Sequence, residues 1–566
     1  MLRTCLASLL LALSALSSTL LQAATPPAAA IASAHPLATR AGFEVMQKGG
    51  NAFDAAIAVA AALAVVEPYS AGMGGGGFWL LHRASDKHQV MLDARETAPL
   101  AATRDMYLNA DGEVERDWAV NGPAAAGIPG QAAAFAHLAA AYGQLPLAES
   151  LAPAIRLARD GFKVDEKYRR MAWFRKDVLN RFPEARRLFL ANGEVPLLDH
   201  LIIQTDLAAT LQAIADHGHA GFYDGPVAKK LVEGVQFNGG LWTEEDLKQY
   251  RVIERPPVVG TFRGAKIIAA APPSSGGIVM IEALNILENF NDGFIDPALL
   301  PHLAVEAMRR AYHDRARYLG DPDFVEMPVA KLISKEYAAS RAATIALDRA
   351  SDSSKLGEPI TVQQGDHTTH LSVLDQQGNR VSATLSINLP FGSAFVPPGT
   401  GVLLNNEMDD FSAKPGAPNA YGLVGSEANA IAPGKRPLSS MTPTFVEWDN
   451  KVAILGTPGG SRIISMVMLG VLQALNDKPP IDWVSAPRFH HQYLPDQVQA
   501  EPDFIATDAG KDLLLRGHKV ESTGRPYGNM QAILWSGQSV QAASDPRGVG
   551  DAKVLDMRAL RQAPAQ

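Results

Sequence analysis

Two short stretches decide the fold, Thr368-Thr-His-Leu-Ser-Val373 and Val381-Ser-Ala-Thr-Leu-Ser-Ile-Asn388. Apolar and polar residues alternate in both, which is typical of β-strands that turn one face towards a core. The segment between them, Asp375-Gln-Gln-Gly-Asn379, is rich in residues that form turns. The three segments together predict an antiparallel hairpin.

The apolar residues also predict the register of this hairpin. A register that sets apolar residues opposite one another pairs Val373 with Val381. Continued along the strands, the same register places Ser386 opposite Thr368. We therefore expect the Ser386 hydroxyl to lie within hydrogen-bonding distance of the Thr368 Oγ. Two half-buried strands with a polar outer face are the alternative interpretation of the pattern.

The rest of the chain alternates between strand-like and helix-like stretches. Ala52–Val66 is apolar on nearly every side, which predicts a helix buried in the core. Phe78–His82 and Val90–Asp93 are apolar runs around a polar turn and predict a second hairpin. Strands, a helix-rich middle and further strands favour an α+β layered fold. Besides Ala52–Val66, helices are predicted at Pro36–Lys48, Leu147–Asp160, Leu207–His217, Gly277–Asn289, Leu300–Tyr318, Ile463–Asn476 and Ala509–Arg516.

The composition favours a globular protein without a nucleic-acid partner. Of the 566 residues, 47% are hydrophobic and 19% are charged, which is sufficient for a large buried core and argues against disorder. The formal net charge is -8. Binding to nucleic acid needs a concentrated basic face, and this charge argues against one.

The N-terminus predicts export. Arg3 precedes the apolar run Leu6–Leu21, and small residues follow it, as in a secretory signal peptide. A membrane anchor is the alternative, but the run is short for one. Residues 1–24 are therefore expected to be removed, which would leave a periplasmic or secreted protein without a membrane attachment. The single cysteine, Cys5, would be lost with them, so the mature chain would have no disulfide or thiolate chemistry.

Three further motifs accompany the hairpin. They are Gly365-Asp-His-Thr368, Asn405-Asn-Glu-Met-Asp-Asp-Phe-Ser412 and Arg436-Pro-Leu-Ser-Ser-Met-Thr-Pro443. With the hairpin they resemble the γ-glutamyltransferase (γ-glutamyltranspeptidase) family of N-terminal-nucleophile hydrolases, over nearly the whole chain. The resemblance implies a four-layer αββα sandwich, formed jointly by two subunits that the precursor makes by cutting itself. These subunits would span residues 25–367 and 368–566, and no metal or organic cofactor is implied.

The same resemblance makes Thr368 the nucleophile, which a cut after His367 exposes as an N-terminal residue. A threonine hydroxyl needs a base to remove its proton. An N-terminal threonine supplies its own α-amine, whose reference pKa of roughly 7.7–8.0 leaves it partly unprotonated near neutral pH. The uncut chain lacks this amine, so we expect it to be inactive towards external substrates.

A γ-glutamyl group has an α-carboxylate and an α-ammonium, so its site needs both signs of charge. By resemblance, Gly459 and Gly460 donate the hydrogen bonds of the oxyanion hole. Arg95 is matched to the carboxylate, and its planar guanidinium suits bidentate contact. The other matches are Ser439 and Ser440 for the carboxylate, Asn388, Glu407 and Asp410 for the ammonium, Ser386 beside the nucleophile, and Tyr421 as the gate of a lid loop.

The resemblance predicts a glutathione hydrolase and γ-glutamyltransferase. Glutathione or another γ-glutamyl compound would be the donor, and water or the amine of an amino acid or dipeptide the acceptor. The two subunits would remain together as a heterodimer. A cephalosporin (glutaryl) acylase of the same fold is the nearest alternative, although a glutaryl group has no α-ammonium to bind. A binding protein that keeps the fold but does not cut itself is the alternative from another class.

The pair His490-His491 is interpreted as structural rather than as a metal site. Adjacent residues point in different directions, and no carboxylate partner is patterned nearby.

Overall fold

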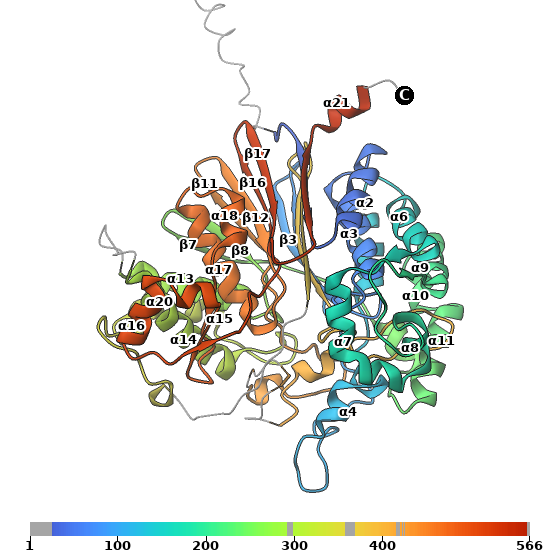
Figure 1. Ribbon diagram of the computed structural model, residues 1–566, viewed down its shortest axis with the longest axis horizontal. Coiled ribbons are helices and arrows are strands. Elements are labelled where there is room, and N and C mark those ends of the chain that lie inside the picture. Colours follow the sequence, from blue (N-terminus) through green and yellow to red (C-terminus); the bar gives the residue numbers. More distant parts are fainter. Residues whose placement is uncertain are drawn as a thin grey trace, which may run out of the picture.

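The computed structural model describes residues 25–290, 298–356, 368–414, 419–420, 423 and 425–562. Its centre is a pair of β-sheets that pack face to face, and helices cover the outer face of each sheet (Figure 1). The layers therefore follow one another as α, β, β, α. This order confirms the α+β class and the predicted four-layer sandwich.

The first sheet interleaves strands from both halves of the chain. Its order is β18-β1-β9-β10-β2-β3-β6, so the hairpin β9–β10 lies between strands from the N-terminal part. The predicted second hairpin is present as β2–β3. The strands are β1 (Ala29–Ser33), β2 (Gly76–Arg83), β3 (His88–Ala94), β6 (Ile253–Arg255), β9 (Thr369–Leu374), β10 (Arg380–Ser386) and β18 (Asp551–Leu555).

The second sheet has the order β17-β16-β12-β11-β8-β7. Two of its strands lie in the middle of the chain, where we predicted mainly helices. They flank the two-residue turn Arg263-Gly264, whose backbone has positive φ at both positions. The strands are β7 (Val258–Phe262), β8 (Ala265–Ala269), β11 (Thr444–Trp448), β12 (Lys451–Gly456), β16 (Gln531–Ser536) and β17 (Ser539–Ser544). Two small sheets join β4 (Phe162–Lys163) to β5 (Leu201–Ile202), and β13 (Phe489–His490) to β14 (Val498–Ala500) and β15 (Val520–Ser522).

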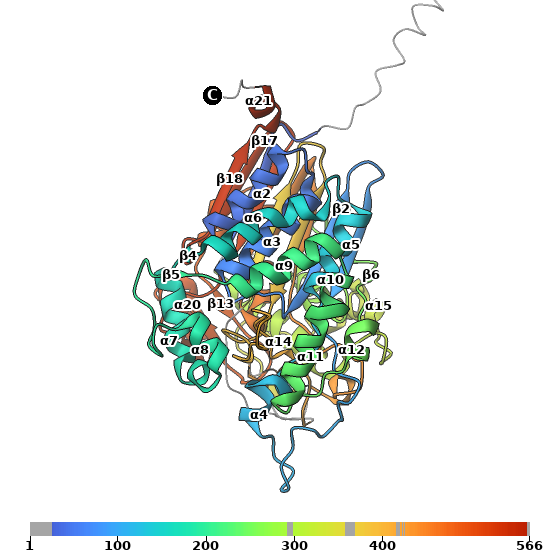
Figure 2. The ribbon, with the colours of Figure 1, turned by 90° about the vertical axis from the view of Figure 1, so that its right-hand side faces the viewer.

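All the predicted helices are present, with ends within two residues of those expected. The helix α3 (Ala52–Val66) is buried along its whole length, and a capping box of Asn51 and Asp54 begins it. Figure 2 shows the helical layer that covers the first sheet. This layer contains α2 (Pro36–Gln47), α3 (Ala52–Val66), α5 (Gln131–Ala141), α6 (Leu147–Asp160) and α9 (Thr205–His217). Beyond them lie α7 (Glu166–Arg181), α8 (Pro183–Phe189), α10 (Ala220–Tyr223), α11 (Gly225–Phe237) and α12 (Glu244–Gln249).

The opposite helical layer covers the second sheet (Figure 1). It contains α13 (Gly276–Glu288), α14 (Leu300–Tyr318), α17 (Ile463–Leu475) and α18 (Pro480–Ser485), with α15 (Val329–Leu332), α16 (Lys335–Ala342), α19 (Pro502–Ile505) and α20 (Asp508–Leu515) around them. Of the α-helices in the described residues, α4 (Arg116–Val120) and α21 (Met557–Gln562) remain. None of the helices in the described ranges is both long and apolar enough to cross a membrane.

The central hairpin has the predicted register. Val381 pairs with Val373, and Leu385 pairs with Thr369 at the end of the ladder. One further step along the same register places Ser386 across from Thr368. The apolar pattern was sufficient because a slip of one residue would turn every apolar side chain of the hairpin to the other face.

Both faces of the hairpin are buried, which corrects the alternative of a polar outer face. The polar face packs on the second sheet, where the Ser382 Oγ donates a hydrogen bond to the Leu455 carbonyl at 3.1 Å. His370 lies in the same layer, 2.9 Å from the Thr384 Oγ1, and burial lowers its pKa to about 3. The alternation therefore separates an apolar interface from a polar one, and neither face is solvated.

Candidate active site

One cavity, called the first cavity, brings together most of the residues predicted to act on substrate. Thr368 lies just before β9, and Ser386 ends the neighbouring strand β10. The cavity is small, about 20 Å³. The described residues that line it are Arg95, Thr368, Ser386, Asn388, Glu407, Asp410, Leu423, Leu438, Ser439, Ser440, Met441, Gly460 and Ile463.

The turn between β12 and α17 contains Gly459 and Gly460, and Gly460 lines the first cavity together with Thr368. Gly459 and Gly460 have φ values of 143° and 55°, in the region that favours glycine. A Cβ on Gly459 would lie only 2.4 Å from the Met466 Cε. Neither glycine N–H donates a hydrogen bond to another described residue. Both can therefore donate to a ligand, as an oxyanion hole requires.

Thr368 and Ser386 lie side by side at the ends of their strands. Thr368 is only 5% exposed. The Ser386 Oγ accepts a hydrogen bond from the Asn388 N–H at 2.8 Å, which fixes the position of this hydroxyl. The Asn388 amide in turn donates to the Asn406 carbonyl at 2.8 Å. The expected hydrogen bond between Ser386 and Thr368 stays a prediction.

Arg95 is fully buried and pairs with the two carboxylates that were matched to the ammonium group. Its Nη1 lies 2.6 Å from the Glu407 Oε2, and its Nη2 lies 2.5 Å from the Asp410 Oδ2. The Nε donates to the Pro437 carbonyl at 3.2 Å. Positive and negative groups thus face each other in one small volume. A zwitterionic amino-acid group matches this arrangement, because its carboxylate can pair with the arginine and its ammonium with the acids.

The acidic groups around Arg95 outnumber it. Glu96, whose Oε2 lies 3.5 Å from the Arg95 Nη1, is a third carboxylate, fully buried, that sequence analysis missed. Burial raises the pKa of Glu96 to about 7. Burial also raises the pKa of Glu407, although the charge of Arg95 acts in the opposite direction. The Glu407 Oε1 has no hydrogen-bond partner in the described chain. This oxygen can therefore accept one more hydrogen bond, as from an ammonium group.

Arg315, on α14, is a second buried arginine that sequence analysis missed. Its Nη2 donates to the Ser440 Oγ at 3.2 Å, and its Nε donates to the Ser275 Oγ at 2.9 Å. No carboxylate of the described chain forms an ion pair with it, and burial lowers its pKa to about 10. Its charge therefore acts on the serine side of the first cavity. The helical pattern predicts α14, but no local signal links position 315 to residues 40 and 125 positions away.

Two predicted residues cannot be placed. Tyr421, the expected gate, and His367, on the expected cut, lie outside the described residues. So do residues 1–24, the expected signal peptide. Leu423, from the loop that was matched to the lid, is described and lines the first cavity.

The pair His490-His491 is buried and hydrogen-bonded. His490 lies 2.9 Å from the Ser465 Oγ, and burial lowers its pKa to about 3. The His491 Nε2 lies 3.2 Å from the Asp496 Oδ1, so a carboxylate does lie near the pair, contrary to the sequence interpretation. That carboxylate also pairs with Arg309. The two rings thus belong to separate networks, as expected of structural residues.

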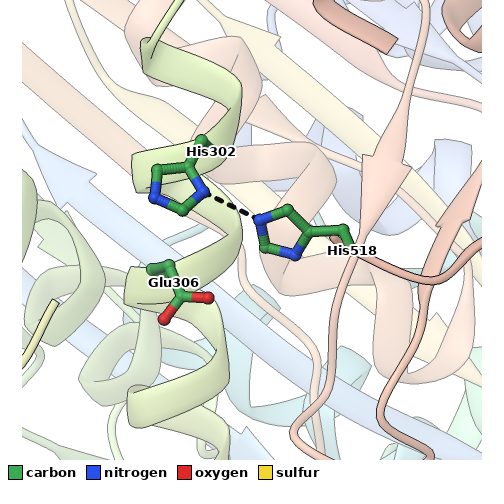
Figure 3. Close-up of side chains that lie close together, drawn as sticks. All are labelled: His302, Glu306 and His518. Atoms are coloured by element: carbon green, nitrogen blue, oxygen red, sulfur yellow. Dashed lines mark hydrogen bonds between the residues drawn. The ribbon is translucent and has the colours of Figure 1, made fainter. Parts of the chain in front are cut away.

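A different group of residues has the spacing of a metal site. His302, Glu306 and His518 lie together between α14 and the C-terminal part of the chain (Figure 3). The His302 Nδ1 and the His518 Nε2 are 2.8 Å apart. Arg309 and Arg310 donate to the Glu306 carboxylate at 3.3 and 2.6 Å. Because two guanidinium groups already neutralise the one carboxylate, we interpret the group as a structural network rather than a cation site.

The geometry of the site indicates a class of protein, and comparison with known proteins identifies the family. A threonine before a central strand of an αββα sandwich, next to two available backbone N–H groups, defines the class of N-terminal-nucleophile hydrolases. Residues 38–555 match the sequence profile described as Gamma-glutamyltranspeptidase, and the chain belongs to this family.

Relatives match over most of the chain. It is 42% identical to a glutathione hydrolase proenzyme of Escherichia coli over 529 residues, which cover 92% of this chain and 90% of the relative. Among solved structures, a cephalosporin acylase from Bacillus halodurans has a TM-score of 0.82 at 30% identity, covering 94% of this chain and 96% of its own. A γ-glutamyltranspeptidase from Helicobacter pylori has a TM-score of 0.55 at 40% identity, covering 57% of this chain and 93% of its own.

Proposed function

We propose that this protein is a self-cleaving glutathione hydrolase and γ-glutamyltransferase. The observation that supports this proposal best is the first cavity, where one arginine and two carboxylates lie next to the predicted nucleophile. An α-amino acid group needs both signs of charge, and a γ-glutamyl compound presents such a group at a fixed distance from its scissile amide. The relatedness to glutathione hydrolase proenzymes supports the same activity.

Self-cleavage is the first step of the proposed mechanism. The Thr368 Oγ attacks the carbonyl carbon of His367, and the peptide nitrogen leaves with a proton as the new α-amine. Water then hydrolyses the resulting ester, which returns the Thr368 hydroxyl and leaves a carboxylate on His367. Large and small subunits would span residues 25–367 and 368–566. Both contribute strands to both sheets, so the subunits would stay associated as a heterodimer.

The second step uses the new N-terminus. The α-amine of Thr368 takes the proton from its own Oγ, which attacks the γ-carbonyl of the donor. The Gly459 and Gly460 N–H groups donate to the oxyanion, and the leaving amine takes up the proton. Water or an acceptor amine then attacks the γ-glutamyl ester and releases the enzyme. Arg95, Ser439 and Ser440 would hold the α-carboxylate; Asn388, Glu407 and Asp410 would hold the α-ammonium; Ser386 would orient the nucleophile, and Tyr421 would cover the cavity.

An acylase activity is the competing proposal, because a cephalosporin acylase is among the structural relatives. The two activities differ in the α-ammonium group, which a γ-glutamyl substrate has and a glutaryl substrate lacks. We expect kcat/KM for γ-glutamyl p-nitroanilide to exceed that for glutaryl p-nitroanilide by about 100-fold or more, the scale of one lost charged contact. Release of p-nitroaniline from the processed protein measures both. The opposite preference would assign the site to acylase chemistry.

Export is part of the proposal. The apolar run behind Arg3 supports a signal peptide that is removed near residue 24. The mass of the large subunit from exported protein tests this, since it shows whether the first residues are missing.

The role of Arg315 gives a sharper test of the carboxylate side of the cavity. Arg315→Met is expected to raise KM for a γ-glutamyl donor about tenfold and to change kcat by less than about threefold. The reason is the loss of the charge-assisted hydrogen bond from Arg315 to the Ser440 Oγ. Folding should tolerate the change, since no buried carboxylate is left unpaired. Arg315→Lys keeps the charge and should recover part of the affinity. Steady-state kinetics measure both variants, and an unchanged KM in Arg315→Met would contradict this role.

A further inference from the structure

A second cavity of about 380 Å³ lies on the other side of the nucleophile. Thr368 lines both cavities, and the two glycines of the turn divide between them, with Gly460 in the first and Gly459 in the second. A substrate whose scissile carbonyl sits on Thr368 therefore extends in two directions. If its γ-glutamyl part fills the first cavity, its leaving group lies in the second.

Among the residues that the structure describes, the lining of the second cavity carries basic side chains and no acidic ones. Lys167, Arg170, Arg525 and Arg547 are part of it, and no described aspartate or glutamate is. The other lining residues are neutral and include Ser70, Pro458, Tyr527 and Asn529. This composition contrasts with that of the first cavity, where carboxylates outnumber the arginine. The second cavity is thus suited to an anionic ligand.

Two of the four basic residues are already neutralised. The Lys167 Nζ lies 2.7 Å from the Glu67 Oε1. Arg547 pairs with Glu501 at 2.7 Å and with Asp545 at 3.2 Å. The positive charges of Lys167 and Arg547 are therefore largely neutralised by ion pairs within the protein.

Arg170 and Arg525 differ from this pair. Arg170 lies on α7, Arg525 follows β15, and both are exposed. Neither forms an ion pair or donates a side-chain hydrogen bond to another described residue. Two guanidinium groups that line the same cavity as the nucleophile thus remain available for an external anion, and they come from opposite halves of the chain.

Asn529, which also lines the second cavity, has a buried amide donor without a partner among the described residues. It is only 3% exposed, and its Nδ2 has no hydrogen-bond acceptor in the described chain. Its Oδ1 is used, since it accepts from the Gln531 amide at 3.0 Å. A buried donor without an acceptor is costly unless a ligand provides one. The atom that would satisfy it is an oxygen, as in a carbonyl or carboxylate.

We propose that Arg170 and Arg525 make the second cavity, where the leaving group and the acceptor of the proposed reaction would lie, select groups that carry a carboxylate. Asn529 donates a hydrogen bond to an oxygen of the same group. This inference rests on the proposed function and deepens it. Peptides and amino acids with a free carboxylate are the favoured ligands, and groups with a second carboxylate are favoured further. Neutral amides and aromatic amines lack the anion that the two arginines bind.

The test compares a free acid with its amide. We expect kcat/KM of the processed protein for γ-glutamylglycine to be at least about tenfold higher than kcat/KM for γ-glutamylglycinamide. Each exposed arginine is expected to contribute a factor of about three to five to this ratio. In the double variant Arg170→Ala/Arg525→Ala the ratio should fall below about threefold. Hydrolysis of γ-glutamyl p-nitroanilide, whose leaving group has no carboxylate, should stay within about twofold. Because exposed charges are screened, the preference of the unaltered protein should also shrink at high salt.

The control is Lys229→Ala, which removes an exposed basic residue on α11, outside the cavity lining. It should leave the acid-to-amide ratio unchanged. An equal ratio in the double variant and the unaltered protein would overturn the proposal, as would the absence of any preference in the unaltered protein. Failure to hydrolyse γ-glutamyl p-nitroanilide would instead contradict the proposed function. In that case calorimetry can compare the binding of glycylglycine with that of glycylglycinamide, a measurement that does not depend on hydrolysis. Tighter binding of the acid would support the proposed selectivity, and equal binding of the two compounds would reject it.

Discussion

Thr368→Ala is expected to remain a single uncut chain and to lose γ-glutamyl hydrolysis by about 10⁴-fold or more, the scale seen when a catalytic nucleophile is removed. The methyl group of alanine has no oxygen to attack the carbonyl of residue 367, so neither the ester nor the new α-amine can form. One substitution therefore removes the nucleophile and its base together. Intact mass of the purified protein and release of p-nitroaniline measure the two losses separately.

Two variants make this result specific. Thr368→Ser keeps the hydroxyl, so we expect two fragments that meet at position 368, formed more slowly. Thr369→Val is the matched control at the neighbouring threonine, whose Oγ1 donates to the Glu67 Oε2 at 2.9 Å. It should still be cut. Cleavage of Thr368→Ala at the same bond would contradict the nucleophile assignment, and an uncut unaltered protein after hours of maturation would favour a binding protein.

Local patterns predicted much of the fold. The hairpin register followed from the apolar pairs Val373 with Val381 and Leu371 with Ala383, and α3 followed from a run that is apolar on nearly all sides. The pattern could not reveal that the polar face of the hairpin is buried too. Alternation looks the same whether polar side chains meet solvent or the backbone of a second sheet, as Ser382 does at Leu455.

The candidate site was predictable only where a motif resembles a family. Arg95, Asn388, Glu407, Asp410 and the two serines line one cavity, as that resemblance implied. Glu96 and Arg315 were missed. Arg315 lies in a helix whose pattern reports only burial, and its partners come from distant segments. Contacts of this kind depend on how the layers pack, and no spacing along the chain encodes them.

Arg95→Lys is expected to raise KM for a γ-glutamyl donor by about 30- to 100-fold, with kcat within about fivefold of the original. In the unaltered protein the planar guanidinium of Arg95 donates hydrogen bonds from three nitrogens. Lysine keeps the positive charge between Glu407 and Asp410 but has no planar guanidinium. The bidentate contact to a substrate carboxylate is lost with it. The oxyanion donors and Thr368 are untouched, so the chemical step should survive. Steady-state kinetics on the processed variant separate KM from kcat.

Stability provides the second measurement, because Arg95 also neutralises buried acids. Arg95→Met should lower the free energy of unfolding by about 3–5 kcal/mol, since it leaves the buried Glu407 and the partly buried Asp410 without this cation. Arg95→Lys should cost less. Arg310→Lys is the matched control, since this buried arginine pairs with Glu306 at 2.6 Å and does not line the first cavity. It should leave KM unchanged. An unchanged KM in Arg95→Lys, with normal processing, would contradict direct carboxylate binding and would leave Arg95 only the role of neutralising the acids.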